Sequence, residues 1–229
     1  MTIHAAIPAM TEADWLPGTI SLLETETEVD IRIWVCVNQP EHWHGDPAKK
    51  HICENNLRTI NYLRGLNNKK ISIIDKSSPG NGWIGKAHGV GHARKTLMDR
   101  ISSEAGEDDI ILSLDADTTF EDGYLKSVKQ CFKIFSFAAA LSNPYYHKLT
   151  ANSELNRAIL RYEIYMRYYA INLWRINSPY SFTALGSAIA VPVASYRKAG
   201  GITAKKSGED FYFLQKLRKT GWICNFNPH

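Results

Sequence analysis

Two aspartates, Asp115 and Asp117, end the mostly apolar run over residues 110–114 of this 229-residue chain. Residues two apart on an extended chain project to the same side, so the two carboxylates repel each other unless a cation or a proton lies between them. Hard oxygen ligands of this kind suit Mg2+ or Mn2+, and Mg2+ commonly takes few carboxylates together with substrate phosphates. The pair predicts either a metal site at the end of a buried strand or an acidic turn that faces water.

A glycine-rich loop at residues 80–87, GNGWIGKA, suggests a different way to bind phosphate. It matches the pattern G-x-x-x-x-G-K, but Ala87 stands where a P-loop NTPase has the Ser or Thr that binds its metal. The loop also follows two β-α units, and the residues KSSP separate it from the preceding strand. A P-loop NTPase or kinase is therefore an alternative, and Lys86 can meet a phosphate at a helix N-terminus in either case.

A second acidic pair, Glu209 and Asp210, opens a helix that the sequence predicts over 207–220, with Ser207 or Gly208 near its N-cap. Acidic residues in a first helical turn are ordinary partners of the helix dipole. The apolar residues that follow indicate a buried helix body, which lets the first turn border a cleft. A carboxylate in that place can accept a proton from a substrate hydroxyl.

The histidines and the overall charge narrow the range of functions. His88 and His92 are four residues apart and His42 and His44 are two apart, but neither pair has a third ligand at a recognisable zinc spacing. Lys and Arg number 27 against 23 Asp and Glu, a net charge of +4. This mild excess permits anionic ligands, and without aromatic residues interleaved among the basic ones it does not predict nucleic-acid binding.

The first half of the chain alternates short apolar runs with helical patterns. The predicted strands are 3–8, 31–37, 71–75 and 109–114, and the predicted helices are 12–24, 48–65 and 86–103. Continuous apolar strands in a β-α rhythm predict a mostly parallel sheet that helices cover on both faces. Ligands of such sheets bind beyond the carboxyl ends of the strands, which is where Asp115 and Asp117 stand. The second half predicts a helix over 121–135 and strands at 137–141 and 187–192.

Residues 153–176 predict a long helix that is rich in Tyr and Arg. Its apolar residues recur at spacings of three and four and form one seam: Leu155, Ile159, Tyr162, Met166, Tyr169 and Leu173. This pattern favours a helix packed on the core with solvated arginines. In the alternative interpretation, exposed aromatic residues and arginines border an acceptor site, a dimer contact or a membrane surface.

Cysteine usage and the N-terminus predict the compartment. Cys36, Cys53, Cys131 and Cys224 are scattered without a C-x-x-C pair, which is typical of buried thiols in a reducing compartment. The N-terminus has no basic region and too short an apolar run for a signal peptide, and the other apolar stretches are too short to span a membrane. We expect a cytoplasmic protein, with peripheral contact at the inner face of the membrane left open.

The order of these motifs resembles the family-two nucleotide-sugar glycosyltransferases of GT-A fold. The resemblance is carried by IPAMTEADWLPGTISLL from Ile7, GKAHGVGHAR from Gly85, Asp115-Ala116-Asp117, Gly186-Ser187-Ala188, RKAGG at 197–201 and Glu209-Asp210. It covers essentially the whole chain and implies an α/β fold with a Rossmann-like, mostly parallel sheet and a smaller acceptor-side portion. It also implies one domain over 1–229, with a nucleotide-sugar-binding half at about 1–120 and an acceptor-binding half at about 121–229.

The resemblance further implies an inverting transfer of a sugar from a nucleotide-diphosphate sugar to a hydroxyl of a saccharide or lipid-linked acceptor, in polysaccharide or glycolipid synthesis. By this resemblance Asp115 and Asp117 hold Mg2+ or Mn2+ against the diphosphate, and His229 is a third metal ligand. Asp210 is the general base, and Glu209 orients the acceptor or Asp210. The residues implied to line the nucleotide pocket are Pro8, Glu12, Asn38, Lys86 and Asp115.

The chain departs from the family pattern in three places. Thr11 stands where the first turn usually has the Asn of an Asn-Glu pair, and Asn38 stands where the second strand usually ends in acidic residues that contact the nucleobase. The Q-x-x-R-W motif of the processive synthases does not follow Glu209-Asp210. The departures at Thr11 and Asn38 leave open a further alternative, a degenerate module that binds nucleotide sugars without transferring them.

Overall fold

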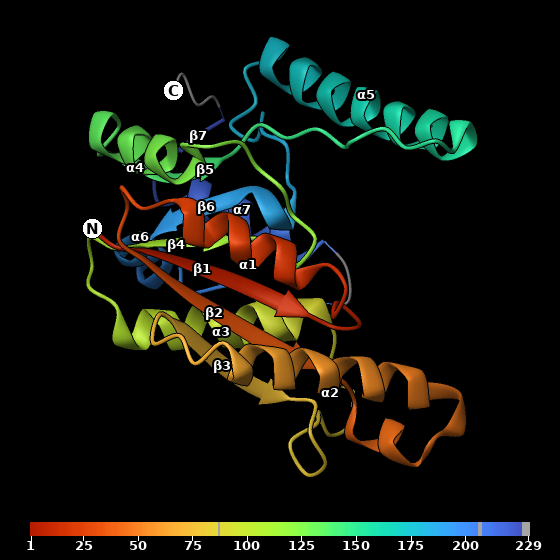
Figure 1. The fold of residues 1–229 in the computed structure, drawn as a ribbon. Coiled ribbons are helices and arrows are strands. Elements are labelled where there is room, and N and C mark those ends of the chain that lie inside the picture. Colours follow the sequence, from red (N-terminus) through yellow and green to blue (C-terminus); the bar gives the residue numbers. More distant parts are fainter. Residues whose placement is uncertain (87, 206–207, 226–229) are drawn as a thin grey trace.

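The computed structural model describes residues 1–86, 88–205 and 208–225 and contains a seven-stranded sheet with helices on both faces (Figure 1). The strands are β1 (Ile3–Ala9), β2 (Ile31–Asn38), β3 (Ile71–Lys76), β4 (Ile110–Ser113), β5 (Ala138–Ser142), β6 (Ile189–Pro192) and β7 (Trp222–Cys224). The helices are α1 (Leu16–Thr25), α2 (Lys50–Gly65), α3 (Val90–Glu104), α4 (Tyr124–Ile134), α5 (Ser153–Arg175), α6 (Val193–Lys198) and α7 (Glu209–Arg218). Short 3-10 turns lie at η1 (Glu41–Gly45), η2 (Pro47–Lys49) and η3 (Gly186–Ala188).

The strand order is β3-β2-β1-β4-β6-β5-β7, and it creates a switch point between β1 and β4. The first three strands run outward from β1 in one direction, and β4 then pairs with β1 on its other side. All of these pairs are parallel, whereas β6 runs antiparallel to both β4 and β5. A crevice at the carboxyl ends of β1 and β4 is where an open α/β sheet binds its ligands.

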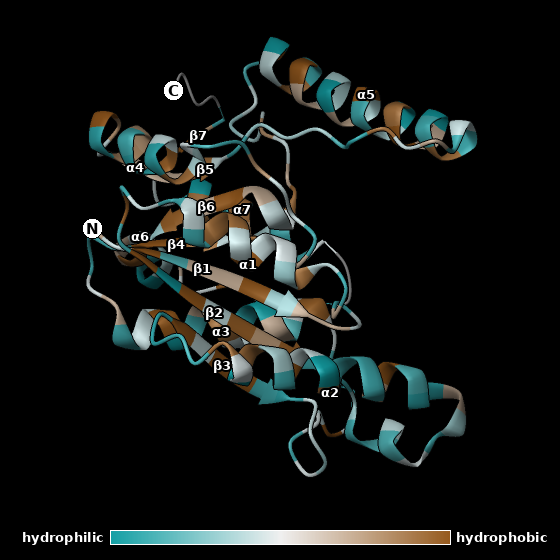
Figure 2. Ribbon diagram, viewed as in Figure 1, coloured by the Kyte–Doolittle hydropathy of each residue, from teal (hydrophilic) through white to brown (hydrophobic). Residues whose placement is uncertain are grey.

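The apolar strands explain why helices cover both faces. Every residue of β1 is buried, so the strand has no solvent face, and β4 is buried throughout as well. One core packs α1, α2 and α4 on one face of the sheet, and a second core packs α3, α6 and α7 on the other. In Figure 2 the hydrophobic residues follow the strands. The predicted α/β fold with a mostly parallel sheet is confirmed.

Several element boundaries differ from the sequence expectation. The first helix begins at Leu16 rather than at residue 12, with a proline in its first turn. The third helix begins at Val90 rather than 86, because Gly89 has a φ of 99° and ends the preceding loop. The predicted strand at 187–192 is a 3-10 turn followed by the shorter β6. The sequence patterns missed α6 and β7, which are only six and three residues long.

The long helix α5 forms where it was predicted, but its preferred packing was wrong. Of its residues only Glu163 is buried, and Leu155, Tyr162 and Tyr169 of the expected seam are exposed. Figure 1 shows α5 standing off from the sheet beside the segment that follows β5. Apolar periodicity identifies a helix face but not what covers it, and in the described part of the chain the segment after β5 contacts α5 through Tyr145 and His147. In the described part of the chain no helix is both long and apolar enough to cross a membrane.

Candidate active site

The Asp115-Ala116-Asp117 turn begins where β4 leaves the sheet. The Leu114 N–H donates to the Ala6 carbonyl at 3.1 Å, which extends the pairing with β1 by one residue. The chain then turns, because the Thr118 N–H donates to the Asp115 carbonyl at 3.2 Å and the Asp115 N–H donates to Thr118 Oγ1 at 3.0 Å. The turn leaves the Asp115 side chain half-buried and exposes Asp117 at the carboxyl end of β4.

Helix α1 fixes this turn from the side of β1. The Thr19 hydroxyl lies 2.8 Å from the carbonyl oxygen of Ala116 and 3.1 Å from that of Thr118, and it donates to this pair of carbonyls. Thr19 is buried and belongs to the helix that follows the Glu12 loop. The loop after β1 and the turn after β4 are therefore held together at the switch point.

A buried arginine, Arg94 of α3, connects the two acidic motifs. Its Nη2 donates to Asp115 Oδ1 at 2.8 Å, and its Nη1 donates to Glu209 Oε1 at 2.5 Å. Its Nε donates to Ser113 Oγ at 3.0 Å, and the Arg94 side chain is only 4% exposed. Sequence reasoning missed this residue. The signal available was its place on the apolar stripe of the helix, among Ala93, Leu97, Met98 and Ile101, where an unpaired charge is not tolerated.

The Gly186-Ser187-Ala188 segment makes room for this arginine. A Cβ atom added to Gly186 would lie 2.7 Å from Arg94 Cζ, so only glycine lets the backbone approach the guanidinium so closely. The Ser187 side chain forms a hydrogen bond with Asp115. The segment thus contacts both members of the Arg94–Asp115 pair, which gives this sequence motif a physical role.

Negative charge accumulates at the switch point. Burial raises the pKa of Asp115, as does the neighbouring Asp117, while Arg94 and Ser187 act in the opposite direction. Burial also raises the pKa of Glu12, and the charges of Asp117 and Asp115 raise it further. Across the described residues, Asp117 itself enters no ion pair, although both other carboxylates feel its charge. A cation beside Asp117 would relieve this repulsion.

The donor set suits a divalent cation that shares its coordination with a substrate. Among the described residues, no three His, Cys, Asp or Glu side chains are placed to enclose a metal ion together. Mg2+ and Mn2+ sites of this type use one or two carboxylates and take further oxygens from phosphates and water. Asp117, with Asp115 beside it, fits that requirement. His229, the expected third ligand, lies outside the described residues.

The acidic pair of α7 divides into a buried and an accessible carboxylate. Glu209 is buried against α3, and its carboxylate is paired with Arg94. Asp210 is partly exposed in the first turn of the helix, where its Oδ1 accepts a hydrogen bond from the Phe211 N–H at 2.8 Å. Helix α7 starts after Gly208, which has a φ of 71°. Of the two acids, Asp210 is therefore the one that a substrate can reach.

The remaining residues expected at the nucleotide pocket have different surroundings. Pro8 is buried inside β1, and Lys86 is exposed in the loop before α3. Asn38 is buried, where its Nδ2 donates to the Ala9 carbonyl at 3.0 Å and its Oδ1 accepts from Trp83 Nε1 at 3.3 Å. Because both ends of the Asn38 amide are bonded inside the protein, its contact with a nucleobase stays a prediction.

The glycine-rich loop is held by a side chain of the protein itself. The Glu41 carboxylate accepts hydrogen bonds from the Gly80 N–H at 2.8 Å and the Gly82 N–H at 2.7 Å. These bonds lower the pKa of Glu41, because both stabilise its charged form. A P-loop leaves such N–H groups free for phosphate, and its helix starts at the motif, whereas α3 starts only at Val90. The loop geometry argues against the P-loop alternative.

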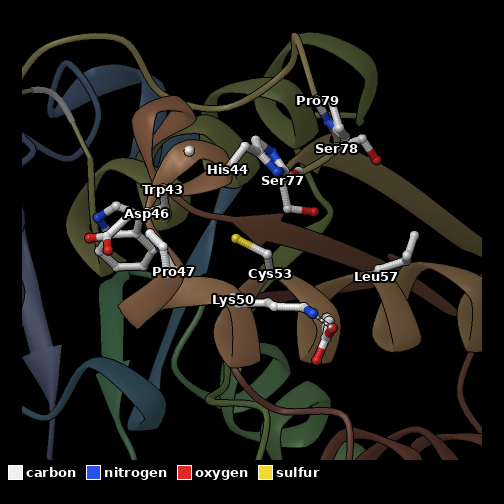
Figure 3. A pocket seen from close by; sticks show the side chains of 12 residues that line it. Trp43, His44, Asp46, Pro47, Lys50, Cys53, Leu57, Ser77, Ser78 and Pro79 are labelled. Carbon is white, nitrogen blue, oxygen red and sulfur yellow. Dashed lines mark hydrogen bonds and ion pairs between the residues drawn. The ribbon is translucent and has the colours of Figure 1, made fainter.

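A cavity of about 400 Å3 lies beyond the ends of β2 and β3, beside α2 (Figure 3). Its walls come from η1, η2, α2 and the segment after β3: Trp43, His44, Gly45, Asp46, Pro47, Lys50, Cys53, Glu54, Leu57, Ser77, Ser78 and Pro79. None of the residues predicted to bind or react lines it. Hydrogen bonds from Gln39 to Cys53 Sγ, from Asn56 to Gln39 Oε1, and from the Thr11 N–H to Asn56 Oδ1 connect its wall to the loop after β1.

Comparisons with known proteins identify the fold. No family model and no curated protein matches the sequence. Among solved structures, S. aureus TarS 1–349 is 13% identical over 100% of this chain, with a TM-score of 0.61. The mannosyltransferase PcManGT from Pyrobaculum calidifontis, in complex with GDP-Man and Mn2+, is 11% identical over 99% of this chain, also with a TM-score of 0.61. Glucosyl-3-phosphoglycerate synthase from Mycobacterium tuberculosis, in complex with Mn2+, UDP-Glc and phosphoglyceric acid, is 13% identical over 97%, with a TM-score of 0.53.

The chain is shorter than these structures. It spans 59% of the TarS chain, 55% of the mannosyltransferase chain and 69% of the synthase chain. These neighbours are GT-A glycosyltransferases; TarS was also determined with UDP-GlcNAc, and the mannosyltransferase and the synthase were determined with a nucleotide sugar and Mn2+. The recognition of this fold from the sequence motifs is confirmed. The protein has the GT-A fold of the nucleotide-sugar glycosyltransferases.

Proposed function

We propose that the protein is a metal-dependent, inverting glycosyltransferase of the family-two type, which moves a sugar, a hexose by resemblance, from a nucleotide-diphosphate sugar to an acceptor hydroxyl. The observation that carries this proposal is the double ion pair of Arg94, which joins Asp115 of the D-x-D turn to Glu209 of the Glu-Asp pair. Two motifs that are distant in the sequence thereby meet at the switch point of a GT-A sheet. The fold of the structural neighbours, some of which hold UDP-GlcNAc, GDP-Man or UDP-Glc, supports the same class of donor.

The donor side of the proposed site contains the three carboxylates of the switch point. Asp117, with Asp115 beside it, would hold Mg2+ or Mn2+ against the donor diphosphate. When bound, the cation offsets the charge that develops on the leaving diphosphate. Arg94 holds Asp115 in one orientation, and Glu12 borders the same charged region. The other proposed nucleotide-pocket residues are Pro8, Asn38 and Lys86, and His229 remains a proposed third ligand.

The acceptor side of the proposed site contains Asp210. Its carboxylate accepts the proton of the acceptor hydroxyl as that oxygen forms a bond to the anomeric carbon and the bond to the diphosphate breaks. Attack opposite the leaving group inverts the anomeric centre. Glu209 does not take part in the proton transfer, because its carboxylate is buried and paired with Arg94. It orients the first turn of α7, and with it Asp210.

The proposal includes the organisation and setting of the enzyme. Residues of about 1–120 supply the donor half and residues of about 121–229 the acceptor half. We propose a saccharide or lipid-linked acceptor, and a role in polysaccharide or glycolipid synthesis, on the resemblance alone. We also propose a cytoplasmic location, with peripheral contact at the inner face of the membrane left open; cysteines that form no disulfide among the described residues support the reducing compartment.

Release of nucleoside diphosphate from a series of UDP- and GDP-sugars in the presence of Mn2+ tests the proposal. Asp210→Asn should lower turnover by about 10²- to 10⁴-fold, the usual contribution of a general base, with donor binding unchanged. Asp122→Asn is the control, because Asp122 is exposed outside the site. An unchanged rate in Asp210→Asn would rule out its role as the base. Donor binding without release by the wild-type protein would favour the binding module, and phosphate release from ATP would favour the NTPase.

A further inference from the structure

Helix α5 presents a face that nothing else in the described chain covers. The helix is attached through its opposite side, where Glu163 Oε1 lies 2.8 Å from His147 Nδ1 and Arg167 Nη2 donates to the Tyr145 carbonyl at 2.6 Å. Ile159 and Met166 are partly buried on that attached side. Figure 1 shows the helix extending beyond the body of the protein. An exposed helix of 23 residues with one buried side chain calls for a partner.

The uncovered side of α5 combines arginines with apolar residues. We define the outer face of α5 as the stripe of exposed residues at spacings of three and four opposite Ile159 and Met166: Arg157, Leu160, Arg161, Ile164, Tyr168, Ile171 and Arg175. Ile164 is 67% exposed and Tyr168 is 66% exposed. The carboxylate nearest to this face is Glu154, which is exposed in the first turn three residues before Arg157, so the face carries three arginines against one carboxylate. Within the described residues its three arginines form no ion pair, so their charge is available to a partner.

Aromatic side chains border this face. Tyr162, Tyr165 and Tyr169 lie along one edge, with the rings of Tyr165 and Tyr169 stacked, and Trp174 lies toward the other edge with 68% of its surface exposed. Tyr and Trp are the residues enriched at the boundary between lipid and water, because their rings are apolar and their tips are polar. The border therefore matches a partner that offers an apolar phase beneath a polar surface.

We propose that the outer face of α5 binds the anionic surface of a lipid bilayer. Leu160, Ile164 and Ile171 would enter the boundary between headgroups and acyl chains, while the arginines extend along them to the lipid phosphates. A second copy of the chain fits this face poorly, because it would bring three arginines of each copy together with one carboxylate per copy, Glu154, to offset them. An anionic polymer could pair with the arginines but offers no apolar phase for the isoleucines. The proposal is independent of the transferase activity.

Cosedimentation with vesicles tests the charge requirement. The wild-type protein should bind vesicles of mixed phosphatidylcholine and phosphatidylglycerol, bind phosphatidylcholine vesicles weakly, and lose the difference at high salt. A variant that carries Arg157→Gln, Arg161→Gln and Arg175→Gln should bind the anionic vesicles about 100-fold more weakly. Each basic residue near such a surface contributes roughly fivefold to binding, and three contribute about 100-fold together. Failure of the wild-type protein to prefer anionic vesicles overturns the proposal.

A matched control distinguishes the contribution of the α5 arginines to vesicle binding from the contribution of the net charge of the protein. Arg32, Lys69 and Lys70 are exposed at the amino-terminal ends of β2 and β3, outside the candidate site. Their replacement by Gln removes the same charge and should leave vesicle binding at the wild-type level. An equal loss in this control would show that net charge, and not α5, drives the binding, and would overturn the proposal.

The apolar requirement has its own variant. Ile164→Ser with Tyr168→Ser should weaken binding to anionic vesicles while the circular dichroism spectrum keeps its helical signal, since both side chains point away from the protein. Unchanged binding would overturn the insertion of this face. Size-exclusion chromatography tests whether a second copy of the chain binds this face instead. A wild-type dimer that becomes a monomer in the Ile164→Ser, Tyr168→Ser variant would assign the face to a second copy and overturn the proposal.

Discussion

Arg94 of α3 and Glu209 of α7 form a buried ion pair across 115 positions of the sequence. The same guanidinium pairs with Asp115, so one side chain is bonded to the turn after β4 and to the first turn of α7. A buried charge that loses its partner is costly, whereas an intact pair fixes the geometry of the elements that carry it. Neither acidic motif can therefore move without disturbing the other.

Loss of this arginine should destabilise the protein strongly. Arg94→Met leaves Glu209 buried without a counter-charge, and we expect the free energy of unfolding in urea to fall by about 3–5 kcal/mol. Arg58→Met is the matched control, because Arg58 pairs with Asp14 where both side chains are more than 60% exposed, and it should cost less than about 1 kcal/mol. Equal effects of the two substitutions would mean that the Arg94 pair has no special role in the site.

Glycine at position 186 should be required by its contact with Arg94. The methyl group of Gly186→Ala would overlap the guanidinium at 2.7 Å, so we expect a loss of about 1–3 kcal/mol in the free energy of unfolding. Gly65→Ala, in the last turn of α2, meets no atom within 4 Å and should be neutral or slightly stabilising. A neutral Gly186→Ala would show that the guanidinium can shift freely.

Thr11, in the loop after β1, should carry backbone strain. Thr11 has a φ of 68°, a conformation in which a β-branched residue is strained and Asn is better tolerated. The family pattern has Asn in this place, so Thr11→Asn should raise the free energy of unfolding by about 1 kcal/mol. Thr27→Asn, in the exposed turn after α1, has no positive φ to relieve and serves as the control. A loss of stability in Thr11→Asn would contradict this account of the turn.

The charge at the switch point should make stability depend on pH. Glu12 and Asp115 have raised pKa values, so the folded state binds their protons more tightly than the unfolded state does. The folded state is then favoured as the pH falls through these pKa values and loses that stability as the pH rises above them. Asp117→Asn removes part of the repulsion. Without cations it should raise the melting temperature at pH 7, and the gain in the free energy of unfolding should be less than about 1 kcal/mol because the groups are partly solvated.

With Mn2+ present, the wild-type protein should have a higher melting temperature at pH 7 than the Asp117→Asn variant, the reverse of the order without cations. Mn2+ should stabilise the wild-type protein at pH 7 and less so at pH 5, where more of the carboxyl groups are protonated. The Asp117→Asn variant should respond weakly at both pH values. If the Asp117→Asn variant has a lower melting temperature than the wild-type protein at pH 7 without cations, the neighbouring carboxylates do not destabilise the charged form of Asp117.

The sequence was sufficient for the fold because the fold follows from local patterns. Continuous apolar strands and the helices between them are visible within windows of ten residues, and the motif order then indicated the GT-A type. The acidic residues of the candidate site could be named because two carboxylates at the end of an apolar run already imply a cation or a cleft. The roles of these residues remain predictions.

Other features depend on contacts that sequence patterns do not contain. Arg94 acquires its meaning from partners 21 and 115 positions away, and Asn38 is turned inward by Ala9 and Trp83. The glycine-rich loop has the sequence of a phosphate-binding loop, but the N–H groups of Gly80 and Gly82 already donate to the Glu41 carboxylate. For α5, the helix forms as its apolar seam predicts, but no core of the described residues lies against that seam. In each case the sequence pattern does not show which residue, distant in the sequence, contacts the group in question.

The most direct test of the central claim is the melting temperature of the wild-type and Asp117→Asn proteins with UDP- and GDP-sugars, with and without Mn2+. The proposed function predicts that at least one nucleotide sugar raises the melting temperature of the wild-type protein by roughly 5–10 °C at about 100 times its Kd. This rise should require Mn2+ and be largely lost in Asp117→Asn. A rise that is the same in both proteins, or one produced by ATP and by no nucleotide sugar, would contradict the claim.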